Sequence, residues 1–389
     1  MKKRLLSALL VLVLAVSLCL TAAAAGTPEE EQDPNYYYFT DRDGNEMMAP
    51  VYAFASYIVD YTPGTPWTNV ESGKDPKYTL GLPYDDKPCY ILGGGGSITL
   101  GFDISIYDGE GLDIYVFEYG ASVESTKVEV SDDLETWYDV GIAVGLSAGV
   151  DLNGKVPEGS RFRYVRLTDL YDDPSGPYPG ADIMGVSGLN YKAITSAWAS
   201  QEVDRADAMG LVPEVLYGKD MTKPITRLEF AAVCVKVFEN LTGTKALPAV
   251  RNPFTDTEDI EVLKAYNAGI TNGTSETTFS PDMLLNREQC ATMLTRVFKR
   301  ATIPSWSLET DGDFQLDYIQ PEAFADDALI SAWAKNSVYF MAANGIINGM
   351  GNNLFVPRNT TPAEEAQAYA NATREQALAI AVRMVNQLK

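Results

Sequence analysis

Apolar and polar positions follow two different patterns along the 389-residue chain. From about residue 26 to residue 192, short apolar and β-branched runs alternate with turns rich in Gly, Asp and Pro, which is typical of an all-β sandwich. We expect strands at residues 97–102, 112–118, 127–131 and 162–168. Residues 35–55 have no clear assignment.

From about residue 196 to residue 389, apolar residues recur at helical spacing instead. We expect helices at residues 196–209, 229–241, 289–298, 331–344 and 376–388. The segment 190–195 is the expected joint between the halves. The chain is therefore predicted to be multidomain, with a β-sandwich over 26–192 and an all-α region over 196–389.

The first 25 residues have the composition of a secretory signal peptide. Three basic residues precede an apolar run over 5–20, and four alanines follow at 22–25. No later stretch contains the roughly 18 apolar residues of a membrane helix. We therefore expect a secreted protein that is not inserted in the membrane after the signal peptide is cleaved.

Charge and residue usage exclude several functions. The chain has 30 Lys and Arg against 53 Asp and Glu, a formal net charge of −23, and no His. The missing His excludes a Ser-His-Asp triad and His-ligated zinc, and the acidity argues against nucleic-acid binding. Of the later cysteines, Cys234 and Cys290 lie on apolar helix faces, so we expect buried thiols rather than a disulfide framework.

The helical half contains one unit three times. Each unit has a helix ending in Gly plus an aliphatic residue, a loop, and a Thr/Asn-Arg pair that opens a second helix. The glycines are Gly210, Gly269 and Gly345, and the arginines are Arg227, Arg287 and Arg374. The Gly-to-Arg spacings are 17, 18 and 29, so the third unit carries an insertion, around 360–372.

The residue before each Arg predicts a helix cap. Thr226 with Glu229 forms a capping-box pattern, which Asn286–Gln289 and Thr373–Gln376 repeat. Each Gly is the expected left-handed stop of the preceding helix. Capping does not explain the Arg, because a cation in the first turn faces the positive end of the helix dipole. A bound anion or a nearby carboxylate would each compensate, and the residues alone leave both open.

These motifs resemble the S-layer homology (SLH) domain. The shared features are F-x-D at 254–256 and 324–326, W-A at 198–199 and 333–334, G-I-x-x-G at 269–273 and 345–349, F-x-P at 279–281 and 355–357, and the T-R-x-E/Q helix start. The resemblance implies three SLH repeats, about 196–245, 252–302 and 322–389, in a pseudo-threefold bundle. The first unit departs from the pattern, since it lacks F-x-D and the second Gly, and its groove is expected to be degenerate.

SLH grooves bind secondary cell-wall polysaccharide, often pyruvylated, in Gram-positive bacteria. The resemblance assigns this polysaccharide-binding role to Arg227, Arg287, Arg374, Gly269, Gly273, Gly345, Gly349 and Trp333.

The first half resembles a discoidin-type or galactose-binding-like jelly roll of bacterial cell-surface proteins over 91–191. The resemblance rests on G-G-G-G-S-I-T-L at 93–100, D-I-Y-V-F-E at 113–118, R-Y-V-R-L-T-D at 163–169 and G-A-D-I-M-G-V at 180–186. Such sandwiches often bind glycans, sometimes with a calcium ion. Several aspartates lie in turn-like segments. Their carboxylate oxygens could bind Ca²⁺, which prefers oxygen ligands, or could simply be solvated. Asp169 with Asp182 is the favoured pair for calcium.

Together these features predict a non-enzymatic, exported protein of the cell wall or S-layer. Its repeats would bind an acidic secondary cell-wall polysaccharide, and its sandwich would present a site for a glycan or host ligand. One alternative is a structural S-layer lattice protein. Another is a surface glycan-active enzyme, because a glycosidase needs only two carboxylates and acids are abundant here.

Overall fold

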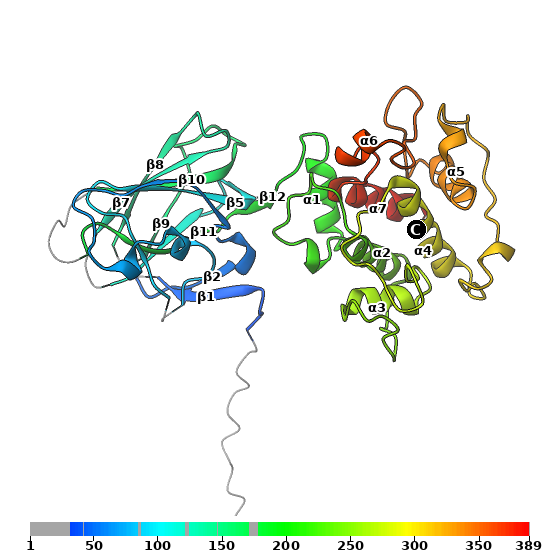
Figure 1. Ribbon diagram of the computed structural model, residues 1–389, viewed down its shortest axis with the longest axis horizontal. Helices are drawn as coiled ribbons and strands as arrows, with labels where there is room; N and C mark the ends of the chain where they lie inside the picture. The colour runs from blue at the N-terminus through cyan, green and yellow to red at the C-terminus, as the bar shows by residue number, and fades with distance from the viewer. Residues whose placement is uncertain are drawn as a thin grey trace, which may run out of the picture.

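The computed structural model describes residues 32–388, except 42, 85–86, 121–123, 146 and 171–177. The expected signal peptide lies outside the described residues. Figure 1 shows a strand-rich N-terminal region beside a helical C-terminal region, so the predicted multidomain arrangement is confirmed. No described helix combines the length and the apolarity needed to cross a bilayer.

The strand-rich region contains two antiparallel sheets and a separate hairpin. The larger sheet has the order β12-β5-β10-β7-β8, with β3 also paired to β5. Its strands are β3 (Tyr57–Thr62), β5 (Ser97–Tyr107), β7 (Ser125–Ser131), β8 (Tyr138–Val144), β10 (Arg161–Asp169) and β12 (Tyr191–Ala193). The smaller sheet, in the order β4-β11-β6-β9, contains β4 (Tyr90–Ile91), β6 (Ile114–Glu118), β9 (Ser147–Val150) and β11 (Asp182–Gly188).

Strand β6 is buried on both faces because layers lie on each side of it. Ile114 and Val116 point into the core between the sheets. Tyr115 and Phe117 face outward, where they pack with residues of the hairpin β1 (Tyr36–Thr40) and β2 (Glu46–Pro50). The hairpin is the structure of the previously unassigned segment, and it explains why β6 is apolar at every position.

The helical region contains seven α-helices within the described residues. They are α1 (Ser200–Ala208), α2 (Arg227–Thr242), α3 (Ile260–Asn267), α4 (Arg287–Thr302), α5 (Lys335–Ala343), α6 (Pro362–Ala366) and α7 (Arg374–Leu388). Helices α2, α4 and α7 form the centre of the core, and Cys234 and Cys290 are free and buried there as expected. Helix α6 lies in the predicted insertion.

A closed ring of backbone hydrogen bonds joins the segments that lead into α2, α4 and α7. The Ile225 amide donates to the Ala372 carbonyl (2.8 Å), the Ala372 amide to the Leu285 carbonyl (3.0 Å), and the Leu285 amide to the Ile225 carbonyl (3.2 Å). The starts of the three long helices are therefore fixed at one place.

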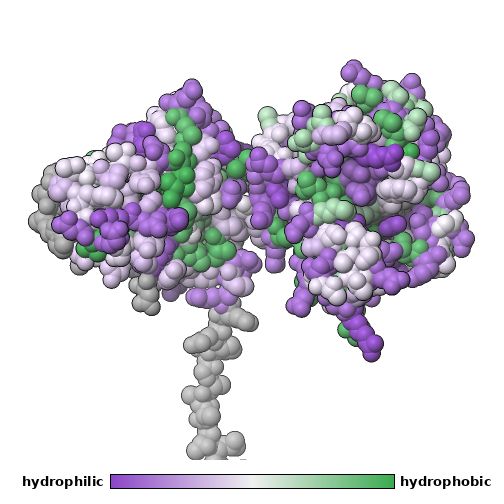
Figure 2. Space-filling model, in the orientation of Figure 1, coloured by the Kyte–Doolittle hydropathy of each residue, from purple (hydrophilic) through white to green (hydrophobic). Residues whose placement is uncertain are grey.

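The two regions contact each other through the first helical unit. The Met221 amide donates to the Ile194 carbonyl (2.9 Å), and the ring of Tyr217 packs on that of Tyr52 at 5.7 Å. Gly218 lies against Tyr52 so closely that a Cβ there would come within 2.5 Å of the Tyr52 Cβ. Figure 2 shows the resulting outline, two mostly polar bodies that meet at a narrow waist.

Candidate functional site

The three predicted capping boxes are present and place each Arg at the first turn of a long helix. The Thr226 amide donates to Glu229 Oε2 (3.0 Å), and the Glu229 amide donates back to the Thr226 hydroxyl (3.3 Å). The same reciprocal bonds join Asn286 with Gln289 and Thr373 with Gln376. The three guanidinium groups therefore begin from equivalent backbone positions.

Each Arg reaches the loop of the next unit rather than that of its own. Arg227 Nη2 donates to the Thr271 hydroxyl (3.0 Å) and to the Asn272 carbonyl, both in the second unit's G-I-x-x-G segment. Arg287 Nη2 donates to the Asn348 carbonyl (2.7 Å) in the third unit's segment. Each predicted groove is thus shared by two units. The sequence did not predict this pairing, because the motifs of each unit were assigned to a groove of that same unit.

Two of the arginines lie over aromatic rings. The guanidinium of Arg227 is 4.8 Å from the centre of the Phe279 ring, and that of Arg287 is 5.2 Å from Phe355, distances typical of cation–π contacts. Arg287 Nε also donates to the Phe355 carbonyl (2.8 Å). The F-x-P phenylalanines therefore form one wall of these two sites.

The F-x-D aspartates position these phenylalanines. The Asp256 carboxylate accepts the amides of Phe279 and Ser280 (2.8 Å each). Asp326 likewise accepts the amides that begin F-x-P in the third unit, at 2.8 and 2.7 Å. Ser280, which follows the phenylalanine, has a positive φ of 60°. The F-x-D aspartate and the F-x-P turn are therefore joined by two hydrogen bonds in each of these two units, an arrangement called the F-x-D/F-x-P latch below.

Arg287 is buried and Arg227 is half-buried, and neither guanidinium forms an ion pair with a carboxylate of the described residues. Burial lowers the pKa of both guanidinium groups, and nearby Arg296 lowers that of Arg227 further. Asp326 partly offsets the effect of burial on Arg287, because its charge raises the pKa of that guanidinium. Arg227 Nε is buried without a hydrogen-bond partner among the described residues. A guanidinium that is largely removed from water and has no ion-pair partner favours an anionic ligand.

Arg374 differs from the other two. Its Nη2 and Nε donate to the two carboxylate oxygens of Glu229, at 2.7 and 3.0 Å, and its Nη1 donates to the Asp220 carbonyl (2.9 Å). Of the two compensations left open by the sequence, the carboxylate is therefore the one found at Arg374.

The motif glycines shape the turns. Gly269 and Gly345 have φ of 75° and 66°, the left-handed helix stop that the sequence predicts. A Cβ at Gly273 would lie 2.3 Å from the Ser275 carbonyl oxygen, and one at Gly349 would lie 2.7 Å from that of Leu354. These contacts account for the glycines as loop residues, and their contact with polysaccharide stays a prediction.

Trp333 is 59% exposed and lies just before α5, as Trp198 does before α1. The Ser331 amide and hydroxyl donate to Glu288 (2.8 and 2.9 Å), which fixes the segment carrying Trp333. Glu375 holds the Ser196 amide and hydroxyl in the same way (2.8 Å each). These glutamates are not among the residues predicted from the motifs, although each directly follows a motif Arg.

Asp169 and Asp182 lie at one end of the sandwich among buried acids. Asp169 accepts the Gly95 amide (2.9 Å) and the Ala181 amide (3.1 Å). Asp182 is 8% exposed, and its Oδ1 has no hydrogen-bond partner among the described residues. Burial and neighbouring Glu124 raise the pKa of Asp182 to about 7. Burial, followed by Glu124, raises that of Glu118 to about 8.

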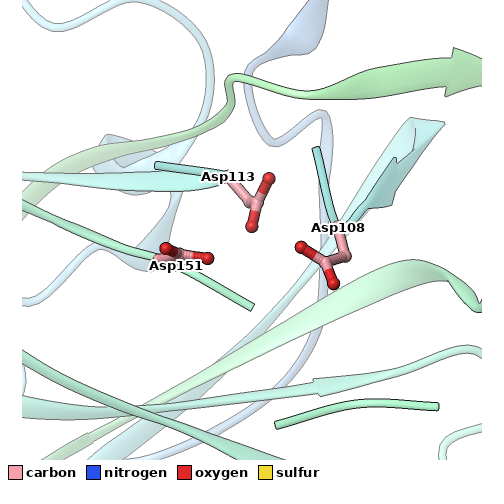
Figure 3. Close-up of side chains that lie close together, drawn as sticks. All are labelled: Asp108, Asp113 and Asp151. Carbon is pink, nitrogen blue, oxygen red and sulfur yellow. The ribbon is translucent and has the colours of Figure 1, made fainter. Parts of the chain in front are cut away.

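A second group of acids, Asp108, Asp113 and Asp151, converges near one end of β6 (Figure 3). Asp113 is fully buried and already accepts three bonds, from the Gly109 amide (2.9 Å), the Leu152 amide (2.7 Å) and the side-chain amide of Asn190 (2.8 Å). Asp113 therefore ties neighbouring loops together through its hydrogen bonds. Asp172 and Asp173, two further aspartates in a turn-like segment of the sequence, lie outside the described residues.

The sandwich also has an aromatic pocket of about 430 Å³ beside the β1–β2 hairpin. Tyr84 and Tyr119 at this pocket are 60% and 53% exposed. Its lining residues are Tyr37, Phe39, Thr40, Pro83, Tyr84, Phe117, Tyr119 and Met184.

Residues 253–291 and 323–361 match the family model of the S-layer homology domain. These two segments are SLH domains. The first SLH segment contains the Gly turn and phenylalanine that face Arg227, and it ends just beyond Arg287. The second SLH segment contains the turn and phenylalanine that face Arg287.

Similar proteins include two large enzymes. The chain is 25% identical over 302 residues to Exoglucanase XynX of Acetivibrio thermocellus, a match covering 73% of the chain and 26% of the relative. It is 29% identical over 150 residues to an Amylopullulanase of Thermoanaerobacterium thermosulfurigenes, covering 37% and 7%. The chain thus spans about a quarter or less of the length of these two relatives.

Among solved structures, the C-terminal domain of a chitobiase from Bacteroides fragilis is 14% identical, with a TM-score of 0.22 over 36% of this chain and 95% of that domain. CBM32-3 from a family 31 glycoside hydrolase of Clostridium perfringens is also 14% identical, with a TM-score of 0.22 over 35% and 91%.

Proposed function

We propose that this is a non-enzymatic cell-surface protein held on the cell wall by its SLH domains, which bind a pyruvylated secondary cell-wall polysaccharide. The observation that carries the proposal is the pair of arginines without an ion-pair partner, half-buried Arg227 and buried Arg287, each placed over a phenylalanine at an SLH Gly turn. A carboxylate on the polymer would supply the charge that these guanidinium groups lack.

The first unit completes the set as a third SLH repeat in a pseudo-threefold bundle. Two observations support this reading. The hydrogen-bond ring of Ile225, Leu285 and Ala372 links equivalent positions of the three units. Arg374 of the third unit reaches the first unit, just as Arg227 and Arg287 reach the units that follow them.

Binding depends on short-range contacts, because a chain with a net charge of −23 repels an acidic polymer at long range. We test it by co-sedimenting the full chain with Gram-positive cell-wall sacculi, before and after acid removal of the secondary polymer. The wild type should bind only unstripped sacculi, and Arg227→Ala/Arg287→Ala should lose binding. Arg300→Ala, which removes an exposed Arg of α4, is the matched control. Equal binding by the double variant and the control would refute the groove assignment.

The sandwich, in this proposal, presents a glycan-binding site to the surroundings. The aromatic pocket supports it, because exposed tyrosine rings offer flat apolar faces with a polar edge for a sugar. Tyr84→Ala/Tyr119→Ala should abolish glycan-array signals, whereas Tyr369→Ala, at an exposed tyrosine of the helical region, should keep them. Lattice formation without glycan binding would favour a structural S-layer protein. Glycan cleavage that one Asp or Glu substitution removes would favour an enzyme.

We also propose that the acids at Asp182 hold a calcium ion. The residues fit the ion, because the buried Oδ1 of Asp182 has no partner among the described residues, and Glu124 and Asp169 lie close enough to raise the pKa of Glu118. Calcium prefers such oxygen ligands and would keep these carboxylates ionised at neutral pH.

A further inference from the structure

The Arg374 site contains a carboxylate supplied by the chain itself. We infer that the Glu229 carboxylate occupies this site in place of a ligand. The protein therefore binds acidic groups of the polymer at the Arg227 and Arg287 sites and excludes them from the Arg374 site. The inference rests on the proposed function of the arginines and specifies which of them the polymer reaches.

The contact has the geometry of a bound anion. Two parallel N–H···O bonds of 2.7 and 3.0 Å join the guanidinium of Arg374 to Glu229, and the side chains are only 13% and 7% exposed. Bidentate pairing of this kind is how a guanidinium recognises a free carboxylate. An incoming carboxylate would have to displace one that is covalently held nearby, which gives Glu229 a high effective concentration.

The other two units have a neutral residue at the equivalent place. Glu229 is the N3 residue of its helix, three positions after the N-cap Thr226. The corresponding residues of the other two helices are Gln289 and Gln376. Since Arg374 meets the capping-box residue of the unit that follows it around the ring, Gln289 is the equivalent residue for Arg227 and Gln376 for Arg287. A glutamine preserves the cap and leaves the Arg without a carboxylate.

The third site also lacks the aromatic wall. Phe279 lies eight residues before Arg287, and the position eight residues before Arg227 is Lys219. The first unit therefore has no phenylalanine to lie beneath Arg374, and an ion pair takes the place of the cation–π contact. Two independent changes, at 219 and 229, alter the same site.

The experiment counts binding sites with a 4,6-pyruvylated hexose glycoside, using isothermal titration calorimetry on the full chain. The wild type should bind two equivalents and Glu229→Gln three, because glutamine keeps the capping bonds and frees Arg374. The reverse change, Gln289→Glu, places a carboxylate at the Arg227 site and should reduce the count to one. Glu364→Gln alters the capping box of α6, which contains no motif Arg, and should leave the count at two.

Other outcomes separate this inference from the proposed function. Three equivalents for the wild type, or two for a folded Glu229→Gln, would overturn the inference alone. No binding by any variant would refute the proposed function. In that case the ¹⁵N signal of Arg374 Nε still tests the pairing: a shift in Glu229→Gln but not in Glu364→Gln supports it, and an unchanged signal overturns it.

Discussion

Asp182 and Glu118 are acids that the fold makes difficult to ionise. Their folded-state pKa values of about 7 and 8 lie above those of an unfolded chain, so the folded protein binds more protons between about pH 4 and pH 8. Their contribution to stability is therefore present at low pH and is lost as the pH rises through the folded pKa values.

We expect the free energy of unfolding, measured by urea titration in EDTA, to decrease between pH 5 and pH 8. Millimolar calcium should reverse the decrease, because a bound cation favours the ionised carboxylates. Asp182→Asn should flatten the pH dependence and abolish the calcium effect. Asp151→Asn, in the acid group of Figure 3, is the control and should retain both. A calcium effect that survives in Asp182→Asn would rule out this site.

At the residue scale, sequence motifs identified the arginines but not what each one touches. Arg227, Arg287 and Arg374 have nearly identical local sequences, and their caps followed from those sequences. Their partners come from another unit 44 to 154 residues away, a separation no local pattern encodes. For the same reason the departures of the first unit from the motif predicted a degenerate groove in that unit, whereas its altered loop faces Arg374 of the third unit.

At the scale of elements, the F-x-D/F-x-P latch is the feature that holds each SLH turn. Asp256→Ala removes the acceptor of two amides, at Phe279 and Ser280, and should lower the free energy of unfolding by about 1–3 kcal/mol. It should also weaken sacculus binding, because Phe279 supports Arg227. Urea unfolding and co-sedimentation measure the two effects. Asp282→Ala, an exposed acid of the same loop, should change neither, and equal effects of the two substitutions would argue against the latch.

Element type followed well from apolar periodicity, and the failures have physical causes. Strand β1 of the hairpin contains three consecutive tyrosines followed by a phenylalanine. Its sequence therefore shows no alternation of apolar and polar residues, and no strand was predicted there. Helix α3 is only eight residues long and gives a weak periodic signal. Strand β5 extends to Tyr107, five residues beyond the expected end, because β12 and β10 both pair with its second half.

At the scale of the whole molecule, the first unit joins the sandwich to the bundle. Gly218→Ala should loosen this joint, because the added Cβ meets the Tyr52 side chain at 2.5 Å and φ is +68°. We expect a larger radius of gyration in small-angle scattering and faster proteolysis near residue 194. Gly159→Ala, with φ of +76° and no atom within 4 Å, imposes similar backbone strain without the clash and is the control. Equal radii for the two variants would contradict a rigid joint.

The contact between the two halves of the chain could not be predicted from the sequence. Composition divided the chain near residues 190–195, but Tyr52, Tyr191 and Tyr217 meet only after both halves have folded. The departure of the first unit from the repeat pattern was visible, and its association with the sandwich was not. The second Gly of the motif is absent from a loop that packs on another domain.

The hydrogen-bond ring around Ile225, Leu285 and Ala372 has a mechanical consequence. If the helical region holds the protein on the wall, as proposed, a pull on the sandwich would enter the helical region at residue 194. In a linear array of repeats the first unit would peel away before the next carried any load. With first and last units joined directly to each other and to the middle one, tension is divided among all three, and the tether yields only when the ring opens as a whole.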